Sequence, residues 1–154
     1  MKKMMSWVSV AALLLVCLLG VTACGQQQQP EYEQPSQEAE ADLGLWKDAA
    51  YKADTELGQG SKTVTVKVKA DERQITLTIH TDKATVGEAL QEHNLLEGEE
   101  AQYGLYVKKI NGILADYDVD QYYWAFYVNG EYAMTGVDTT NIEEGVIYSL
   151  EQTK

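Results

Sequence analysis

Apolar and polar residues alternate with period two in two neighbouring runs near the middle of the chain. The apolar positions are Val64, Val66, Val68, Ile75, Leu77 and Ile79, and the positions between them are mostly threonine and lysine. The polar residues Asp71 and Glu72 separate the two runs. Alternation of β-branched residues on both sides of a short polar turn predicts a β-hairpin.

The pattern changes to helical spacing after this hairpin. Thr85 is followed three residues later by Glu88, which is the spacing of a capping box. The positions that then share one stripe are Val86, Ala89, Leu90 and His93. We therefore predict a helix over residues 86–94.

Three further apolar runs, at residues 105–110, 122–128 and 146–151, predict more strands. Asn111-Gly112 and Asn129-Gly130 are strong signals for type I′ hairpin turns. The order of two strands, a helix and several strands predicts an α+β domain with a β-grasp-like mixed sheet packed against one helix.

The N-terminal segment has the pattern of a signal peptide, which we place at residues 1–23. Lys2 and Lys3 precede an apolar run at residues 8–19, which is too short to span a bilayer permanently. Val21-Thr22-Ala23-Cys24 resembles the lipobox of bacterial lipoproteins, in which the cysteine is lipidated and becomes the mature N-terminus. The alternative is an ordinary secretory peptide cut near Ala23. A lipidated Cys24 predicts a protein held on the extracytoplasmic face of the cell membrane.

The composition changes again after Cys24. Residues 25–42 contain a glutamine run and both prolines, and such a polar segment predicts a disordered tether. Residues 43–60 are expected to be a short helix or an irregular lead-in that lays Trp46 on the domain. We therefore group residues 24–60 as lipidated cysteine, tether and lead-in, and place the folded domain at residues 61–154.

Cysteine content and charge narrow the classes of partner. Cys17 lies in the leader and Cys24 is the expected lipid site, so residues 25–154 contain no thiol for a disulfide or a thiolate metal site. The formal net charge of −12 becomes −14 if Lys2 and Lys3 are removed with the leader. Such an acidic chain repels nucleic acid and anionic lipid headgroups.

The sequence offers little for catalysis or metal binding. His80 and His93 lack the spacing of a ligand pair, so a structural or solvated role is the default. Asp116, Asp118 and Asp120 have the spacing of a calcium loop, but its glycine and closing glutamate are missing. No nucleophile elbow, phosphate-binding glycine loop or zinc-protease motif is present. We expect a binding protein that is not an enzyme and has no catalytic or metal-ligating residues and no cofactor.

Aromatic residues are the remaining unusual feature. Eight of the ten tyrosines lie between Tyr103 and Tyr148, and five of the six residues 122–127 are aromatic. On a strand over this segment, Trp124 and Phe126 point to one face, while Ala125 and Tyr127 point to the other. Because one helix covers only one face, the other is either an exposed binding surface or a solvated face of tyrosines.

The C-terminal half resembles the small β-domain that ends transcobalamin and intrinsic factor, and bacterial domains of unknown function grouped with it. The matching segments are residues 85–90, 103–113, 123–130, 136–137 and 144–147. In those vitamin carriers the β-domain covers one side of a corrin, and the resemblance implies ligand contacts at Trp124, Ala125 and Phe126. Tyr106 and Tyr127 are candidates for the same surface.

The helical domain that supplies most of the vitamin pocket in those carriers has no counterpart in these 154 residues. The resemblance therefore implies either a partial site for cobalamin or another corrinoid, completed by a transporter or a helical-barrel partner protein, or a different ligand. The competing hypothesis is a cell-envelope protein-interaction module, in which an edge strand or aromatic face docks a protein and no small molecule is bound.

Overall fold

The computed structural model describes residues 43–154 of the chain, which contain nine strands and three helices. The strands are β1 (Thr55–Gly58), β2 (Lys62–Ala70), β3 (Arg73–Thr81), β4 (Leu96–Ala101), β5 (Gly104–Ile110), β6 (Ile113–Leu114), β7 (Tyr123–Val128), β8 (Glu131–Tyr132) and β9 (Ile147–Thr153). The helices are the 3-10 helix η1 (Gly44–Asp48), α2 (Val86–Glu92) and α3 (Tyr117–Asp120). The predicted leader, Cys24 and tether lie outside the described residues. Among residues 43–154, no helix is long and apolar enough to cross a membrane.

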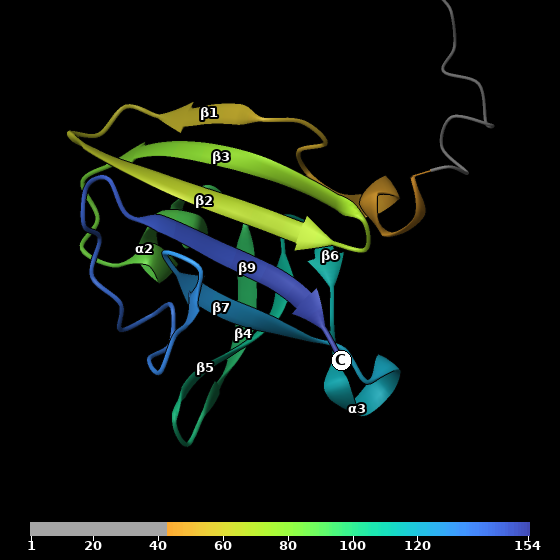
Figure 1. Ribbon diagram of the computed structural model, residues 1–154. Coiled ribbons are helices and arrows are strands. Elements are labelled where there is room, and N and C mark those ends of the chain that lie inside the picture. The colour runs from red at the N-terminus through yellow and green to blue at the C-terminus, as the bar shows by residue number, and fades with distance from the viewer. Residues whose placement is uncertain (1–42) are drawn as a thin grey trace, which may run out of the picture. The chain divides into compact units, whose positions relative to one another are not determined.

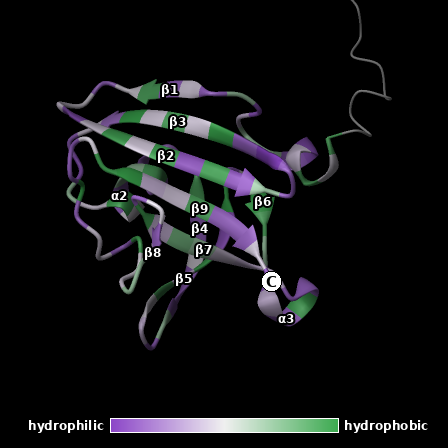
Figure 2. Cartoon of the chain, in the orientation of Figure 1, coloured by the Kyte–Doolittle hydropathy of each residue, from purple (hydrophilic) through white to green (hydrophobic). Residues whose placement is uncertain are grey.

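The predicted hairpin forms the middle of the large sheet. β2 and β3 are antiparallel, and Val66 pairs with Leu77 across them. Both of these side chains are completely buried, while the threonines and lysines between the apolar positions are less buried or exposed. Figure 2 shows the resulting alternation of hydrophobic and hydrophilic residues along the strands of the sheet.

The large sheet is mixed, with the strand order β1-β3-β2-β9-β7-β8 (Figure 1). β9 is parallel to β2 and antiparallel to β7, so the last strand of the chain joins the first hairpin to the aromatic strand. β1 is parallel to β3 at one edge. The mixed sheet and the helix α2 confirm the predicted α+β class.

The predicted capping box at the start of α2 is confirmed. The Thr85 hydroxyl accepts a hydrogen bond from the Glu88 N–H, and the Glu88 carboxylate accepts one from the Thr85 N–H. These bonds satisfy two of the donors that the first turn of a helix leaves free. The helix ends at Glu92, two residues earlier than predicted, and it buries Val86, Ala89 and Leu90 against the sheet.

A second sheet, of order β4-β5-β6, also covers the inner face of the large sheet, on the same side as α2 (Figure 1). Residues 97–100 are polar and lie outside the predicted strands, but this segment pairs with β5 and forms most of β4. The register shifts between Glu97 and Gly98, which is a β-bulge. The polar residues are accommodated because all of β4 after Leu96 is exposed.

Both Asn-Gly turns form as predicted. Asn111 and Gly112 have φ angles of 52° and 82°, and Asn129 and Gly130 have φ angles of 50° and 84°. Positive φ at both central residues is what a type I′ turn requires. The turns connect β5 to β6 and β7 to β8 through two-residue loops.

The folded part of the chain begins well before Ser61. Trp46 on η1 is only 2% exposed, and its indole Nε1 donates a hydrogen bond of 3.0 Å to the carbonyl oxygen of Ala70. Asn111 Oδ1 accepts from the Tyr51 N–H, and Asn111 Nδ2 donates to the Tyr51 carbonyl oxygen. The lead-in is therefore part of the domain, because it completes both the core and the edge of the sheet.

Candidate functional site

The aromatic strand β7 places its largest side chains in the core. Trp124 and Phe126 point to the inner face and are each 7% exposed, and Phe126 stacks on Tyr148 of β9 with ring centroids 6.2 Å apart. Ala125 is 1% exposed, although the register of the sheet turns it to the outer face. These three residues do not form an open stacking surface, since the inner face of β7 lies in the core. Ligand contact at these positions stays a prediction.

The two other predicted ligand residues lie on separate surfaces. Tyr127 is half-buried on the outer face of the large sheet, and its ring meets that of Tyr132 edge to face at 5.6 Å. Tyr106 is exposed on β5 of the small sheet, with the Lys108 ammonium 5.7 Å from its ring centroid. The structure therefore does not bring all five predicted residues together.

One polar atom of the aromatic strand has no partner. The indole Nε1 of Trp124 is buried and makes no hydrogen bond with any described residue. A buried N–H without an acceptor costs about 1–3 kcal/mol relative to a bonded one. Trp124 is therefore the one predicted ligand residue with a buried polar atom that has no partner among the described residues.

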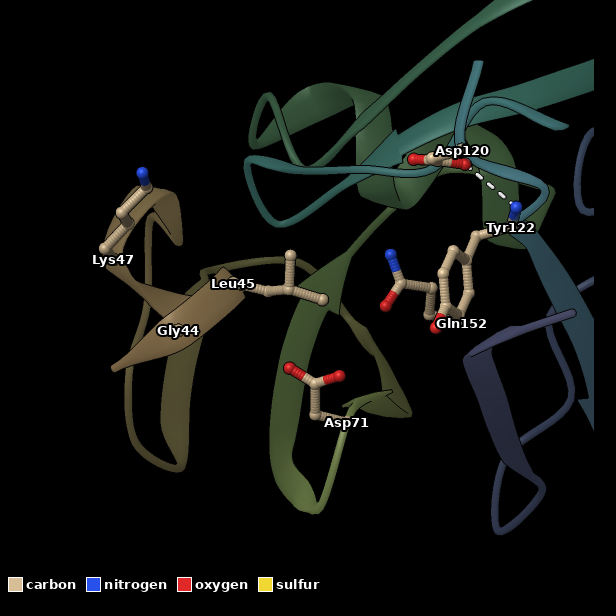
Figure 3. A pocket seen from close by; sticks show the side chains of 7 residues that line it. All are labelled: Gly44, Leu45, Lys47, Asp71, Asp120, Tyr122 and Gln152. Carbon is tan, nitrogen blue, oxygen red and sulfur yellow. Dashed lines mark hydrogen bonds between the residues drawn. The ribbon is translucent and has the colours of Figure 1, made fainter. Parts of the chain in front are cut away.

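A hollow of the described surface lies beside the beginning of β7 (Figure 3). It has a volume of about 710 Å³, which is within the usual range of small-molecule pockets. We call it the Leu45–Tyr122 pocket. Its lining residues are Gly44, Leu45, Lys47, Asp71, Asp120, Tyr122 and Gln152.

Five different parts of the chain build this pocket. η1 contributes Leu45, the β2–β3 turn contributes Asp71, and α3 contributes Asp120. The segment before β7 contributes Tyr122, and β9 contributes Gln152. Figure 3 shows Leu45 and the Tyr122 ring projecting toward the hollow from opposite sides, with the Gln152 amide between them. The two carboxylates lie at different ends of this view, and the lysine points away from the centre.

Hydrogen bonds fix the walls of the pocket. The Tyr122 N–H donates to Asp120 Oδ1 at 2.8 Å, and Gln152 Nε2 donates to the Leu114 carbonyl oxygen at 3.1 Å. On the opposite wall, the Trp46 bond to Ala70 holds η1 against the end of β2. The side chains of Asp120 and Gln152 are therefore held in place by hydrogen bonds within the fold.

The Asp-x-Asp-x-Asp run uses its carboxylates within the fold. Asp116 is the N-cap of α3 and accepts from the Asp118 N–H, and its other oxygen accepts from the Lys108 ammonium at 2.9 Å. This hydrogen bond holds the pKa of Asp116 below its ordinary value. Asp120 Oδ1 accepts from two backbone N–H groups. These bonds explain the run as a helix cap and an ion pair.

The two histidines do not form a pair. His80 lies on the outward side of β3 and contacts Glu56 through Nε2 at 2.7 Å, whereas His93 caps the C-terminal end of α2 on the inner side. Among residues 43–154, no group of three or more His, Cys, Asp or Glu side chains is placed to hold a metal ion.

No direct signal in the sequence indicates the Leu45–Tyr122 pocket. Its residues are separated by up to 108 positions, from Gly44 to Gln152. Asp120 lies in the Asp-x-Asp-x-Asp run and Tyr122 in the aromatic segment, but no local pattern indicates that the two come together with Leu45. The one usable hint was Trp46, because a tryptophan in a short lead-in is expected to pack on the domain. Burial of Trp46 is what brings its neighbours Gly44 and Leu45 to the sheet.

Part of the chain matches a known family model. Residues 83–146 match the family model described as Domain of unknown function (DUF4430). No curated protein matches the chain at a significant level.

The solved structures that are similar to this chain include the following two. One is from Ruminococcus gnavus and carries the description "putative metal binding protein", with a TM-score of 0.57 and 30% identity over 61% of this chain and 98% of that chain. The other is haptocorrin in complex with Cbi, with a TM-score of 0.49 and 19% identity over 60% of this chain and 25% of that chain. The first similarity extends over nearly the whole of the Ruminococcus gnavus chain.

Proposed function

We propose that this protein is a lipid-anchored, extracytoplasmic module that binds a small molecule in the Leu45–Tyr122 pocket. The observation that carries the proposal is the pocket itself, which combines an aliphatic side chain, an aromatic ring and several polar groups. Pockets with mainly apolar walls and a few fixed polar groups are the usual form of ligand sites. Binding without catalysis, cofactor or resident metal remains part of this proposal.

The anchoring part of the proposal rests on the sequence alone. The basic and apolar leader followed by Cys24 favours a lipidated N-terminus, and residues 25–42 would then hold the domain away from the membrane. Metabolic labelling with an alkyne fatty acid tests this directly. We expect label on the wild type and none on Cys24→Ser, and label on both proteins would contradict the assignment.

The ligand class we propose to test first is the corrinoids, because of the resemblance to the β-domain of the vitamin carriers. The order β3-β2-β9-β7-β8, with β2 and β9 parallel, supports the β-grasp-like arrangement that the resemblance implies. The pocket is open and would enclose only part of a corrinoid. A transporter or helical-barrel partner would then cover the rest.

Calorimetric titration of residues 25–154 with cobalamin and with its precursor that lacks the lower ligand tests this ligand class. These residues include every described core side chain. Leu45→Ser and Tyr122→Ala are expected to weaken binding by about tenfold or more, while Tyr132→Ala, on the separate strand β8, should leave it unchanged. Trp124→Phe keeps the aromatic volume but removes the indole N–H, so it tests the predicted contact at that position.

Binding that survives Leu45→Ser and Tyr122→Ala would place the corrinoid elsewhere on the protein. Absence of heat with both corrinoids at millimolar concentration would exclude stand-alone corrinoid binding. Neither result would depend on a partner protein, because the titration contains only this chain and the ligand.

A protein-interaction module is the second candidate, and a separate observation favours it. Tyr103, Tyr132 and Met134 are 93%, 58% and 94% exposed, so these large side chains are open to contact with a protein partner. Photo-crosslinking from position 134 in cells tests for a partner at this surface. A defined crosslinked protein that disappears with Tyr132→Ser would support this function, whereas no crosslink at 103, 132 or 134 would count against it.

A further inference from the structure

Acidic and aromatic groups dominate the chemistry of the Leu45–Tyr122 pocket. Asp71 and Asp120 line it together with the Tyr122 ring, and the one basic lining residue, Lys47, points away from the centre in Figure 3. Asp120 uses Oδ1 for backbone N–H groups, so Oδ2 has no hydrogen-bond partner among the described residues. Asp71 likewise makes no side-chain hydrogen bond or ion pair with residues 43–154. Two carboxylates with spare capacity that line the same hollow as an aromatic ring favour a positive charge there.

The aromatic ring of the pocket already attracts a cation in the free protein. The Lys154 ammonium lies 4.8 Å from the centroid of the Tyr122 ring. A cation within about 6 Å of a ring centroid is held by the negative face of the ring. This contact is independent of the two carboxylates and shows that the ring is accessible to an ammonium group.

We infer that the pocket selects ligands with an ammonium-type cation on a small apolar body, and that Lys154 holds the cation position when no ligand is bound. Leu45 and Tyr122 contact the apolar body, and Asp71 and Asp120 supply the opposing charge. This inference rests on the proposed function, because it names the ligand class of the same pocket. It also makes Lys154 an internal competitor of the ligand.

Choline and 3,3-dimethylbutan-1-ol form a matched pair of probes, since they have nearly the same shape and differ in charge. NMR titration of residues 25–154 follows the signals of Tyr122, Gln152 and Lys154 as each probe is added. We expect choline to bind at least several-fold more tightly than the neutral alcohol. Added salt should weaken choline binding and leave binding of the alcohol unchanged, because salt screens exposed charges.

Three single variants test the roles of the charged residues. Lys154→Ala is expected to tighten choline binding by about two- to fivefold, which is the size of an exposed cation–π contact. Asp71→Asn and Asp120→Asn are each expected to weaken it by a similar factor. Asparagine suits both positions, because it tolerates the φ of 51° at residue 71 and still offers Oδ1 as an acceptor at residue 120. None of the three should change binding of the neutral alcohol.

The outcomes separate the inference from the function on which it rests. Equal binding of choline and the alcohol would overturn the selection for a cation while leaving a small-molecule pocket in place. If neither probe shifts the NMR signals of Tyr122 or Gln152, in the wild type or in Lys154→Ala, the selection for a cation is overturned as well. The corrinoid titration then tests the proposed function separately. Unchanged choline affinity in Lys154→Ala would overturn the role of Lys154 as a competitor.

Discussion

Trp46 shows how much one residue contributes to both the fold and the pocket. It is 2% exposed, its Nε1 donates to the Ala70 carbonyl oxygen, and the Arg73 guanidinium lies 5.8 Å from its ring centroid. The sequence predicted contact between Trp46 and the domain. It could not predict the partner, because Ala70 lies 24 residues away and is brought close only by the β2–β3 hairpin.

Trp46→Ala is expected to lower the free energy of unfolding by about 3–5 kcal/mol, as for other large buried aromatic residues. Trp46→Phe is the matched control, because it retains most of the apolar contact and removes the hydrogen bond to Ala70. We expect it to cost about 1–3 kcal/mol. Urea unfolding curves measure both values, and a loss below 1 kcal/mol for Trp46→Ala would show that η1 does not contribute to the core.

Asp116 gives the protein a defined response to acid. Its hydrogen bond with Lys108 lowers its pKa from the ordinary value of 3.8. A carboxylate with a lowered pKa in the folded state contributes stability that is complete above the unfolded-state pKa and is lost as the pH falls through the folded-state pKa.

The pKa values of Asp82 and Glu88 are also lowered, mainly by backbone hydrogen bonds from Ser61 and Ala84 respectively. Stability should therefore fall when the pH drops below about 4.

Asp116→Asn removes one of these contributions and keeps an oxygen that can cap α3. We expect the variant to be less stable than the wild type at pH 7, because it lacks the ion pair with Lys108. The difference should shrink as the pH falls from 3.8 through the lowered pKa of the folded wild-type carboxylate, because that carboxylate then becomes protonated as well. Urea unfolding at pH 7 and at pH 2.5 measures this, and a difference that stays constant would contradict the assignment.

At the scale of elements, local signals predicted most of the fold. The Thr85 to Glu88 spacing, the alternation in β2 and β3, and both Asn-Gly turns specify their structures through contacts within a few residues. β4 was missed because residues 97–100 are polar and become a strand only through pairing with β5. β1 was missed for a similar reason, since it is four residues long and depends on its pairing with β3.

The cap of α2 provides a test at this scale. Thr85→Ala removes the side-chain acceptor for the Glu88 N–H and is expected to lower the free energy of unfolding by about 1 kcal/mol. Thr85→Ser retains the hydroxyl and should lie within about 0.5 kcal/mol of the wild type. Thermal unfolding compares the two, and equal losses for both variants would assign the effect to the lost methyl contact of threonine.

At the scale of the whole molecule, the candidate site depends on contacts that no local pattern contains. The pocket needs η1 against the sheet, the β2–β3 turn beside it, and α3 next to the beginning of β7. The resemblance to the vitamin carriers placed the ligand on the aromatic strand, where five aromatic residues gather. The small sheet was not expected, and it covers the inner face on which Trp124 and Phe126 lie.

The net charge of −12 has the same sign as the two carboxylates that line the pocket. A negative field around the protein raises the local concentration of cationic ligands and speeds their association at low salt. It acts over about 10 Å at 0.1 M salt, so it assists encounter and leaves selection to Asp71, Asp120 and Tyr122.

Mapping backbone amide chemical shifts in residues 25–154 during titration, first with the corrinoid precursor and then with choline, tests the central claim most directly. The account predicts saturable shifts confined to residues 44–47, 71, 120–122 and 152–154. The shifts should be lost in Tyr122→Ala and retained in Tyr132→Ala. Saturable shifts centred on residues 131–135 or around Tyr106, with residues 44–47 and 122 unchanged, would contradict the Leu45–Tyr122 pocket as the ligand site.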